Sequence, residues 1–248
     1  METINNNITE QTVGGLVAED HRKADVFKKY GIDFCCGGKK TVAKACADKN
    51  VNISLLLSDI AALDEKTQKE IEFKTLKTDA LIHHIVSKHH EYLKINMPLI
   101  FEYSQKVAKA HGNAHPEVVE IFSLFGELKD ELTNHLYKEE NILFPYIQNL
   151  SEAYDNKLTV DTPPFKTVEN PIHMMEQEHV DAHQLLDKIK KLSTEFTPPE
   201  SACTTYKILY IKLKEFEDDL YQHIHLENNI LFPRAVELEK IVTQQMHR

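Results

Sequence analysis

The strongest constraint on the fold is a twelve-residue phrase that occurs twice, 88 residues apart, as NHLYKEENILFP and QHIHLENNILFP. Each copy contains a histidine and a glutamate four residues apart, His135 with Glu139 and His223 with Glu227, and each ends at an Ile-Leu-Phe-Pro stop. Residues i and i+4 lie one turn apart on the same face of a helix, so each copy presents an imidazole and a carboxylate together. The duplication therefore predicts helices that carry a two-fold metal site.

The composition is typical of a soluble helical protein. The chain has 248 residues, enough to bury a core, with only 7 glycines and abundant lysine, glutamate and leucine. Its net charge of −10, without a basic stripe, argues against nucleic-acid binding. The N-terminus is polar, and no apolar run approaches the roughly 18 residues of a membrane span. We therefore expect no nucleic-acid partner and no membrane anchor.

The cysteines indicate a reducing compartment. The four are Cys35, Cys36, Cys46 and Cys203, and the first two are adjacent. Adjacent Cα atoms lie about 3.8 Å apart, below the usual disulfide range, so a bridge between them would be strained. We expect a cytoplasmic protein whose thiols are reactive or bind metal.

The first unit, residues 1–63, is predicted to be a small helical domain that carries the vicinal cysteines. Its predicted elements are a helix around Val17–Tyr30, a turn at Gly31–Asp33, a helix that starts near Thr41, and a helix over about Ser54–Leu63. The charged stretch Asp64–Glu72 has little to bury and is the predicted linker.

The second unit, residues 76–248, shows long amphipathic periodicity and no competing strand pattern. We predict four helices, at about 76–110, 117–149, 171–195 and 201–240. The breaks fall at Ala110–Pro116, Ser151–Pro171 and Thr197–Pro199. Two short outer loops and one long middle loop predict an all-α fold with an up-down four-helix bundle.

Six polar residues fall on the apolar stripes of these helices. His90 lies in the row of Ile82, Val86, Leu93 and Met97, and the other five occupy similar rows. Unpaired polar groups cost roughly 1–3 kcal/mol each in a protein interior, so a shared partner is required. Four imidazoles and two carboxylates favour a dinuclear iron or manganese site, in which the carboxylates bridge and each metal takes two imidazoles. The predicted ligands are His90, His135, Glu139, His179, His223 and Glu227.

Each of these residues also has a simpler interpretation. A lone histidine on an apolar face is commonly a core residue, and a single His-x-x-x-Glu pair is commonly an exposed contact. A structural zinc protein is a further alternative. Ferritin-like bundles need two Glu-x-x-His motifs. Among the predicted ligands only His179 belongs to such a motif, Glu176-x-x-His179, so the ferritin-like arrangement does not fit. The duplicated spacing, 45 and 44 residues within each hairpin, favours the six-ligand site.

Further polar residues flank the predicted ligands. Glu131, Asp219 and Glu178 either orient the site or belong to solvated helix flanks. His183, one turn from His179, stays a candidate ligand, whereas we do not expect ligands among His83, His84, His89 and His225.

The sequence Cys35-Cys36-Gly37-Gly38 precedes a predicted helix. A helix N-terminus and two following lysines would lower a thiol pKa, and the glycines would let a partner approach the backbone closely. The alternative is a pair of small, partly buried side chains at a turn. Cys46 and Cys203 are expected to be inert.

The motifs together resemble the iron–sulfur cluster repair di-iron proteins, which join a small cysteine-bearing domain to a hemerythrin-like bundle. The resemblance rests on FCCGGK from Phe34, HxxxEExILFP from His135, TPPxxACTT from Thr197 and HxxxENNxLFP from His223. It implies that the six predicted ligands hold two iron ions, that Glu139 and Glu227 bridge them beside an oxo group, and that Glu131 and Glu178 lie nearby. His183 and His225 depart from the family pattern.

The resemblance also implies a function. It is the repair of iron–sulfur proteins damaged by oxidative or nitrosative stress, by iron donation or nitric oxide chemistry, with Cys35 and Cys36 as candidate redox thiols. The alternative is a hemerythrin-like carrier or sensor of oxygen or nitric oxide. A simple carrier has no need of the Cys-Cys-Gly-Gly domain, whereas a sensor could use it as a redox sensing arm, so this alternative is kept. Whether the chain is an enzyme or a repair factor stays open, as does its oligomeric state, for which a homodimer is one option.

Overall fold

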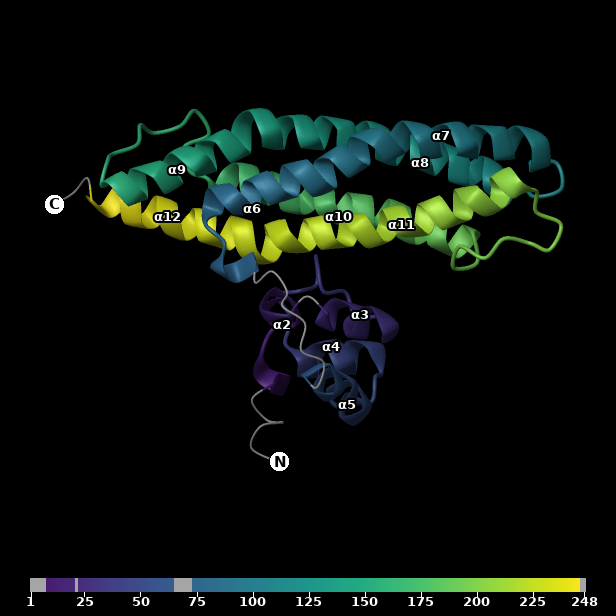
Figure 1. The fold of residues 1–248 in the computed structure, drawn as a ribbon, viewed down its shortest axis with the longest axis horizontal. Helices are drawn as coiled ribbons and strands as arrows, with labels where there is room; N and C mark the ends of the chain where they lie inside the picture. Colours follow the sequence, from purple (N-terminus) through teal and green to yellow (C-terminus); the bar gives the residue numbers. More distant parts are fainter. Residues whose placement is uncertain (1–7, 21, 65–72, 246–248) are drawn as a thin grey trace.

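The structure is a computed structural model that describes residues 8–20, 22–64 and 73–245. A long helical bundle forms one body, and a small helical domain packs beneath its middle (Figure 1). In the described residues the regular elements are helices, and β-type pairing is limited to one isolated bridge between Thr12 and Thr41. The predicted all-α fold is confirmed.

The small domain contains four described helices, α2 (Val13–Glu19), α3 (Lys23–Lys29), α4 (Val42–Lys49) and α5 (Ile53–Asp64). The prediction of one helix around Val17–Tyr30 is wrong. Asp20 leaves the helical conformation, at φ −150° and ψ 103°, and its carboxylate accepts hydrogen bonds from the backbone and guanidinium of Arg22. This local pairing separates α2 from α3, because a short aspartate side chain competes with the helical backbone bonds.

The remaining predictions for this domain agree with the structure where they fall on described residues. Thr41 caps α4, its hydroxyl accepting a hydrogen bond from the Lys44 amide at 3.3 Å. Helix α5 begins at Ile53, one residue before the predicted start. The predicted linker falls mostly on residues 65–72, which lie outside the described residues.

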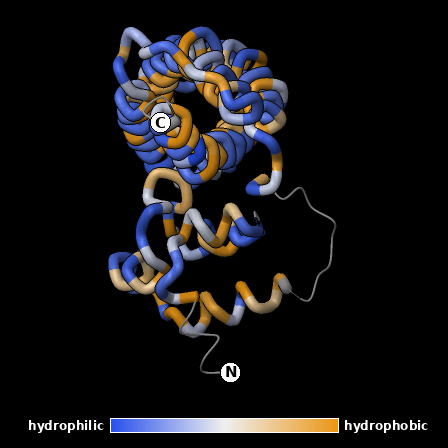
Figure 2. The backbone as a smooth tube through the Cα atoms, turned by 90° about the vertical axis from the view of Figure 1, so that its left-hand side faces the viewer, coloured by the Kyte–Doolittle hydropathy of each residue, from blue (hydrophilic) through white to orange (hydrophobic). Residues whose placement is uncertain are grey.

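The bundle has four rods, three of which contain a π-helical segment. The first is α6 (Thr78–His84), η2 (Ile85–His90) and α7 (Glu91–His111), and the second is α8 (Glu117–Lys138), η3 (Glu139–Leu143) and α9 (Phe144–Asn156). The third is α10 (Glu169–Leu192), and the fourth is α11 (Thr204–Leu226), η4 (Glu227–Leu231) and α12 (Phe232–Gln245). Seen along its axis, the bundle is a ring of helices with the small domain beside it (Figure 2).

The predicted helix ranges of about 117–149 and 201–240 pass through both Ile-Leu-Phe-Pro runs and in this agree with the structure, whereas a helix stop at the runs themselves is wrong. Helices α9 and α12 continue through Pro145 and Pro233. A proline lacks the N–H that an α-helix uses and crowds the carbonyl four residues back, and the wider π turn just before each proline relieves this conflict. The predicted break at Ser151 is also wrong, since Leu150 and Ala153 are buried and continue the apolar stripe to Asn156.

The apolar core falls into two parts. Phe125 and Phe216 pack edge-to-face in one part, with ring centroids 5.4 Å apart. Phe144 and Phe232 belong to the other. A layer of buried polar side chains adjoins the second part, where His90 stacks on Phe144 and His179 on Phe232. None of the helices among the described residues is both long and apolar enough to cross a membrane.

The loop between α3 and α4 fastens the small domain to the bundle. Asn229 donates to the Cys35 carbonyl at 3.2 Å, and the Phe34 ring packs edge-on against Tyr221 and His225. A Cβ at Gly38 would lie 2.6 Å from Asn229 Oδ1, so this position needs glycine. The close approach expected at the glycine pair is therefore made by the chain's own bundle.

Candidate metal centre

All six predicted ligands meet in one buried layer of the bundle. Each side chain is at most 2% exposed. Their ligand-type atoms form two groups, each with its atoms within 4.8 Å of one another. One group is His90, Glu139, His223 and Glu227, and the other is His135, Glu139, His179 and Glu227. Both carboxylates belong to both groups, whereas each imidazole belongs to one.

The π-helical segments coincide with this layer. His90 ends η2, Glu139 begins η3 and Glu227 begins η4. His135 and His223 lie in the last turns of α8 and α11, one turn before the glutamates. π turns are rare and occur often at functional sites, and the periodicity of the sequence did not predict them.

The Nε2 atoms of the histidines face the two carboxylates. His223 Nε2 lies 2.9 Å from Glu227 Oε1, and His179 Nε2 lies 3.1 Å from Glu227 Oε2. His135 Nε2 and His90 Nε2 lie 3.3 and 3.5 Å from Glu139 Oε2. The imidazoles also pair, with Nε2 atoms 3.0 Å apart for His90 and His223 and 3.1 Å apart for His179 and His135.

Three of the four imidazoles have a partner at Nδ1. His90 pairs with Glu140 at 2.7 Å, His135 with Glu178 at 2.9 Å, and His179 with Asn228 at 2.9 Å. His223 Nδ1 has no hydrogen-bond partner among the described residues. A bond at Nδ1 leaves Nε2 free as a ligand atom and fixes the direction of the ring. Glu140 and Asn228 were not predicted, although both belong to the repeated phrase.

Electrostatic interactions in and beside the layer shift the pKa values of Glu227, His135 and Glu178. Burial alone would raise the pKa of Glu227, but His223 and His179 lower it well below its ordinary value. Burial likewise disfavours charge on His135, and the carboxylate of Glu139 outweighs it and raises the His135 pKa to about 10. For Glu178, hydrogen bonds from His135 and Lys138 overcome burial and lower the pKa to about 2.

The donor set fits a pair of cations. Both carboxylate oxygens of Glu139 are buried and accept no hydrogen bond from the described residues. A buried carboxylate without a donor is costly, and cations in the layer would supply the missing partner. Imidazole and carboxylate together suit iron, manganese or zinc.

Known proteins resemble this chain over nearly its whole length. The ScdA_N domain, described as a domain of unknown function, matches residues 9–64, and the hemerythrin HHE cation-binding domain matches residues 81–235. The iron–sulfur cluster repair protein YtfE of Dickeya chrysanthemi is 36% identical over 227 residues, covering 92% of this chain and 97% of the relative. Its namesake in Yersinia pseudotuberculosis is 35% identical, covering 91% of this chain and 96% of the relative. The chain belongs to the iron–sulfur cluster repair protein family. The resemblance inferred from the motifs is confirmed.

In this repair-family protein an acidic pocket lies beside the buried layer. Its volume is about 280 Å³, and its lining includes His135, Glu131, Glu178, Asp181 and also Lys138, which pairs with Glu178. Burial and the neighbouring carboxylates, Glu127 first, raise the pKa of Glu131. Asp219, expected near His223, instead pairs with His89 Nδ1 at 3.0 Å, and the His89 ring stacks on His223.

The vicinal cysteines of the repair-family domain differ in exposure. Cys35 is buried and Cys36 is half-buried, and both are free thiols. The predicted lowering of the thiol pKa is wrong for Cys35. Its contact with Cys36, its burial and the charge of Asp33 raise the pKa well above the ordinary value. The two lysines that follow have carboxylate partners elsewhere instead of the thiols, since Lys39 pairs with Glu176 and Lys40 with Asp48.

Proposed function

We propose that this protein repairs iron–sulfur clusters damaged by oxidative or nitrosative stress, using a di-iron centre held by the six buried side chains. The observation that carries the proposal is the sharing of Glu139 and Glu227 between two groups of ligand-type atoms. The relatives named for repair span both the cysteine-bearing region and the bundle, which supports the same function. Free thiols are consistent with action in the bacterial cytoplasm.

Each residue has a defined role in this proposal. Glu139 and Glu227, which belong to both groups, would serve both cations, His90 and His223 would hold one, and His135 and His179 would hold the other. Iron held there supplies ferrous–ferric redox chemistry and a store of iron for a damaged cluster. Glu140, Glu178 and Asn228 orient imidazoles through Nδ1.

The acidic pocket is the proposed route for iron. Glu131, Glu178 and Asp181 line it together with His135, which belongs to the buried layer. Clustered carboxylates attract a cation and raise its local concentration. Iron that leaves the centre would therefore pass the His135 side of the bundle rather than the face covered by the small domain.

A repair assay tests the function. An iron–sulfur dehydratase inactivated by nitric oxide is incubated with the iron-loaded protein, and recovery of its activity is compared with recovery in an equal amount of ferrous salt. We expect faster recovery with the protein, and recovery no better than the salt with a Glu139→Ala, Glu227→Ala variant. Recovery that never exceeds the salt control would contradict repair.

A second arm of the assay tests the cysteine-bearing domain. The half-buried thiol of Cys36 is the more accessible of the vicinal pair. We expect Cys36→Ser to slow recovery while leaving the iron content of the bundle unchanged, because the two sites lie in different domains. The matched control is Cys203→Ser, which replaces an exposed thiol at the start of α11.

A further inference from the structure

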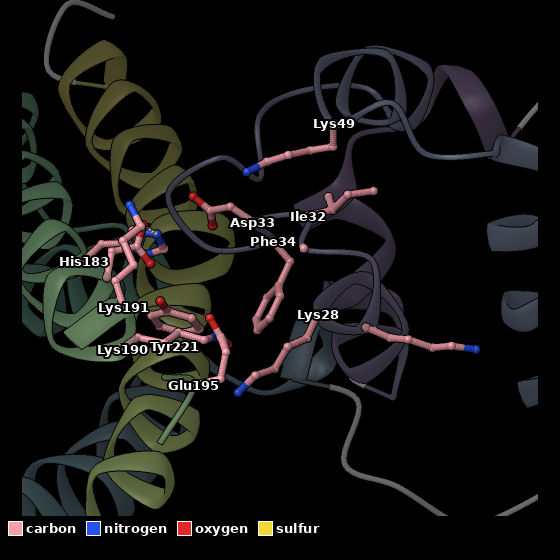
Figure 3. A pocket seen from close by; sticks show the side chains of 13 residues that line it. Lys28, Ile32, Asp33, Phe34, Lys49, His183, Lys190, Lys191, Glu195 and Tyr221 are labelled. Carbon is pink, nitrogen blue, oxygen red and sulfur yellow. Dashed lines mark ion pairs between the residues drawn. The ribbon is translucent and has the colours of Figure 1, made fainter. Parts of the chain in front are cut away.

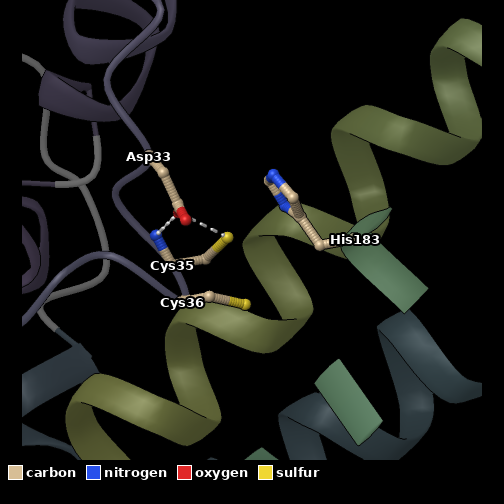
Figure 4. Close-up of side chains that lie close together, drawn as sticks. All are labelled: Asp33, Cys35, Cys36 and His183. Atoms are coloured by element: carbon tan, nitrogen blue, oxygen red, sulfur yellow. Dashed lines mark hydrogen bonds between the residues drawn. The ribbon is translucent and has the colours of Figure 1, made fainter. Parts of the chain in front are cut away.

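A second group of ligand-type side chains lies where the small domain meets the bundle. Asp33, Cys35 and Cys36 come from the loop between α3 and α4, and His183 comes from α10. Their ligand atoms all lie within 4.8 Å of one another, and the side chains converge in Figure 4. The repair chemistry proposed above uses neither Asp33 nor His183.

The loop holds its three side chains in place through its own backbone. Asp33 accepts hydrogen bonds from the amides of Cys35 at 2.9 Å and Gly37 at 2.8 Å. The Cys35 sulfur lies 3.1 Å from Asp33 Oδ1. These contacts bring a carboxylate and two thiols to one side of the loop, toward the bundle.

The bundle supplies a histidine with one unpartnered ring nitrogen. His183 Nδ1 is buried and has no hydrogen-bond partner among the described residues. Its Nε2 lies 3.9 Å from Asp187, beyond hydrogen-bond length. The ring stacks on Tyr221 with centroids 4.9 Å apart, which holds it in position.

We propose that Asp33, Cys35, Cys36 and His183 form a mononuclear site for a divalent cation of the zinc or ferrous type. Two thiolates, an imidazole and a carboxylate together provide the four ligands that a cation of this type prefers. With bonds of about 2.0–2.3 Å, tetrahedral ligands stand about 3.3–3.8 Å apart, so a group within 4.8 Å needs a contraction of at most about 1.5 Å. Each thiol gives up its proton to solvent when it binds the cation.

The surroundings suit the charge of such a site. A divalent cation with two thiolates and one carboxylate carries a net charge of −1. A pocket of about 390 Å³ adjoins the group and is lined by Asp33 and His183 together with lysines, among them Lys28, Lys49 and Lys190 (Figure 3). Lys28 and Lys190 pair with Glu217, so the ammonium groups of Lys49 and Lys191 are the ones that offset the net negative charge, and the pocket gives a cation a path to the ligands.

The site has a structural consequence because its ligands come from two domains. The loop contributes three ligands and α10 contributes one, so a bound cation ties the small domain to the bundle. The nearby pairing of Lys28 with the buried carboxylate of Glu217, at 3.2 Å, holds the same two parts together.

Cobalt titration of the reduced, iron-loaded full chain tests the proposal. Thiolate ligation to Co²⁺ gives a near-ultraviolet charge-transfer band, which nitrogen and oxygen ligands in the bundle do not give. We expect the band to saturate at one equivalent of cobalt in the wild type and to disappear in Cys36→Ser. In His183→Gln, half-saturation of the band should need at least about tenfold more cobalt. The matched controls, Cys203→Ser and the exposed-histidine variant His173→Gln, should behave as the wild type.

Two outcomes of the titration would overturn the site. One is the absence of a thiolate band in the wild type, and the other is a His183→Gln titration that matches the wild type. The iron content and circular dichroism of each variant check that it has folded. X-ray absorption of the zinc-loaded wild type needs no variant, and we expect two sulfur neighbours at about 2.3 Å. A shell of nitrogen and oxygen alone would equally overturn the proposal.

Discussion

The two hairpins of the bundle place the same kinds of side chain in the buried layer but differ on their outer faces. Glu140 and Asn228 occupy the same position of the repeated phrase, and each holds the lone histidine of its own hairpin, His90 or His179. One is an acid and the other an amide, yet both accept a bond from an imidazole Nδ1. The common requirement is an acceptor that orients the ring, and the charge of that acceptor differs between the halves.

The pseudo-symmetry breaks one position before each lone histidine. Glu178 precedes His179 and pairs with His135 Nδ1, whereas its counterpart His89 pairs with Asp219 and stacks on His223. The half with His135 therefore has an acidic pocket beside it, and His223 lacks an Nδ1 partner among the described residues. We therefore propose that iron passes on the side of the layer that holds His135.

The outer faces of the two phrases differ most. Tyr137 is 65% exposed, whereas His225, at the same position of the second copy, is 1% exposed beneath Phe34. Asn141 bonds only its own helix at Tyr137, whereas Asn229 reaches the Cys35 carbonyl of the small domain. In both copies of the phrase one face of the helix contributes to the buried layer. The opposite face differs, and in the second copy it contacts the small domain.

Loss of both shared carboxylates should have the largest effect. We expect the Glu139→Ala, Glu227→Ala double variant to lose iron from both halves at once, because each carboxylate serves both groups. Iron per chain after anaerobic purification measures this. The control is Glu152→Ala, an exposed glutamate on α9, which should keep the wild-type content. Retention of iron by the double variant would refute the assignment.

Glu178 and Glu140, which orient imidazoles, should each affect the retention of one of the two irons. We expect Glu178→Ala to weaken retention of the iron held by His135 and His179, and Glu140→Ala to weaken the other, by about tenfold to a hundredfold. Chelator competition would resolve a fast and a slow phase, and the two variants should accelerate different irons, distinguished by Mössbauer spectroscopy with selective isotope loading. Identical effects on both irons would contradict the separation of the halves.

The matched asparagines test the docking face. We expect Asn229→Ala to lower the free energy of unfolding by about 1–2 kcal/mol, since it removes the side-chain donor that reaches the Cys35 carbonyl of the docked loop at 3.2 Å. Asn141→Ala should stay within about 0.5 kcal/mol, because Asn141 is exposed. Denaturant unfolding of the two variants under one set of conditions gives the comparison. Equal losses would show that the docking contact contributes little.

The acidic pocket should produce the smallest effect. Neutralising Glu131 or Asp181, as Glu131→Gln or Asp181→Asn, should slow iron transfer to a coloured chelator by about fivefold, the rate equivalent of about 1 kcal/mol between charges at a wet surface. Raising the salt concentration should reduce the difference, because screening acts on exposed charges. The control is Asp130→Asn, an exposed acid on the same helix outside the pocket lining. A uniform effect of all three would exclude this route.

The sequence predicted the fold and the convergence of six side chains because both follow from helical periodicity. The apolar stripes placed His90 and His179 beside the repeated phrase, and the structure brings them to the same layer. The π turns escaped prediction, since the apolar periodicity of a sequence does not distinguish a single π turn from the α-helix around it. The break at Asp20 depends on a local bond to Arg22 that no periodicity reveals.

Residues whose partners lie on other elements were the hardest to predict. Asp219 sits one turn before His223 in the sequence but pairs with His89 across the bundle. The pKa of Cys35 was predicted to fall because its sequence neighbours are basic and precede a helix. In the structure the sulfur is buried against Cys36 and Asp33, and these contacts raise the pKa instead.

The central claim is that two irons share Glu139 and Glu227. Its most direct test is Mössbauer spectroscopy, with metal analysis, on protein purified anaerobically and then oxidised. We predict about two irons per chain with a diamagnetic ground state, as magnetic coupling through shared bridges requires. One iron per chain, zinc in its place, or two irons that are magnetically independent would contradict it.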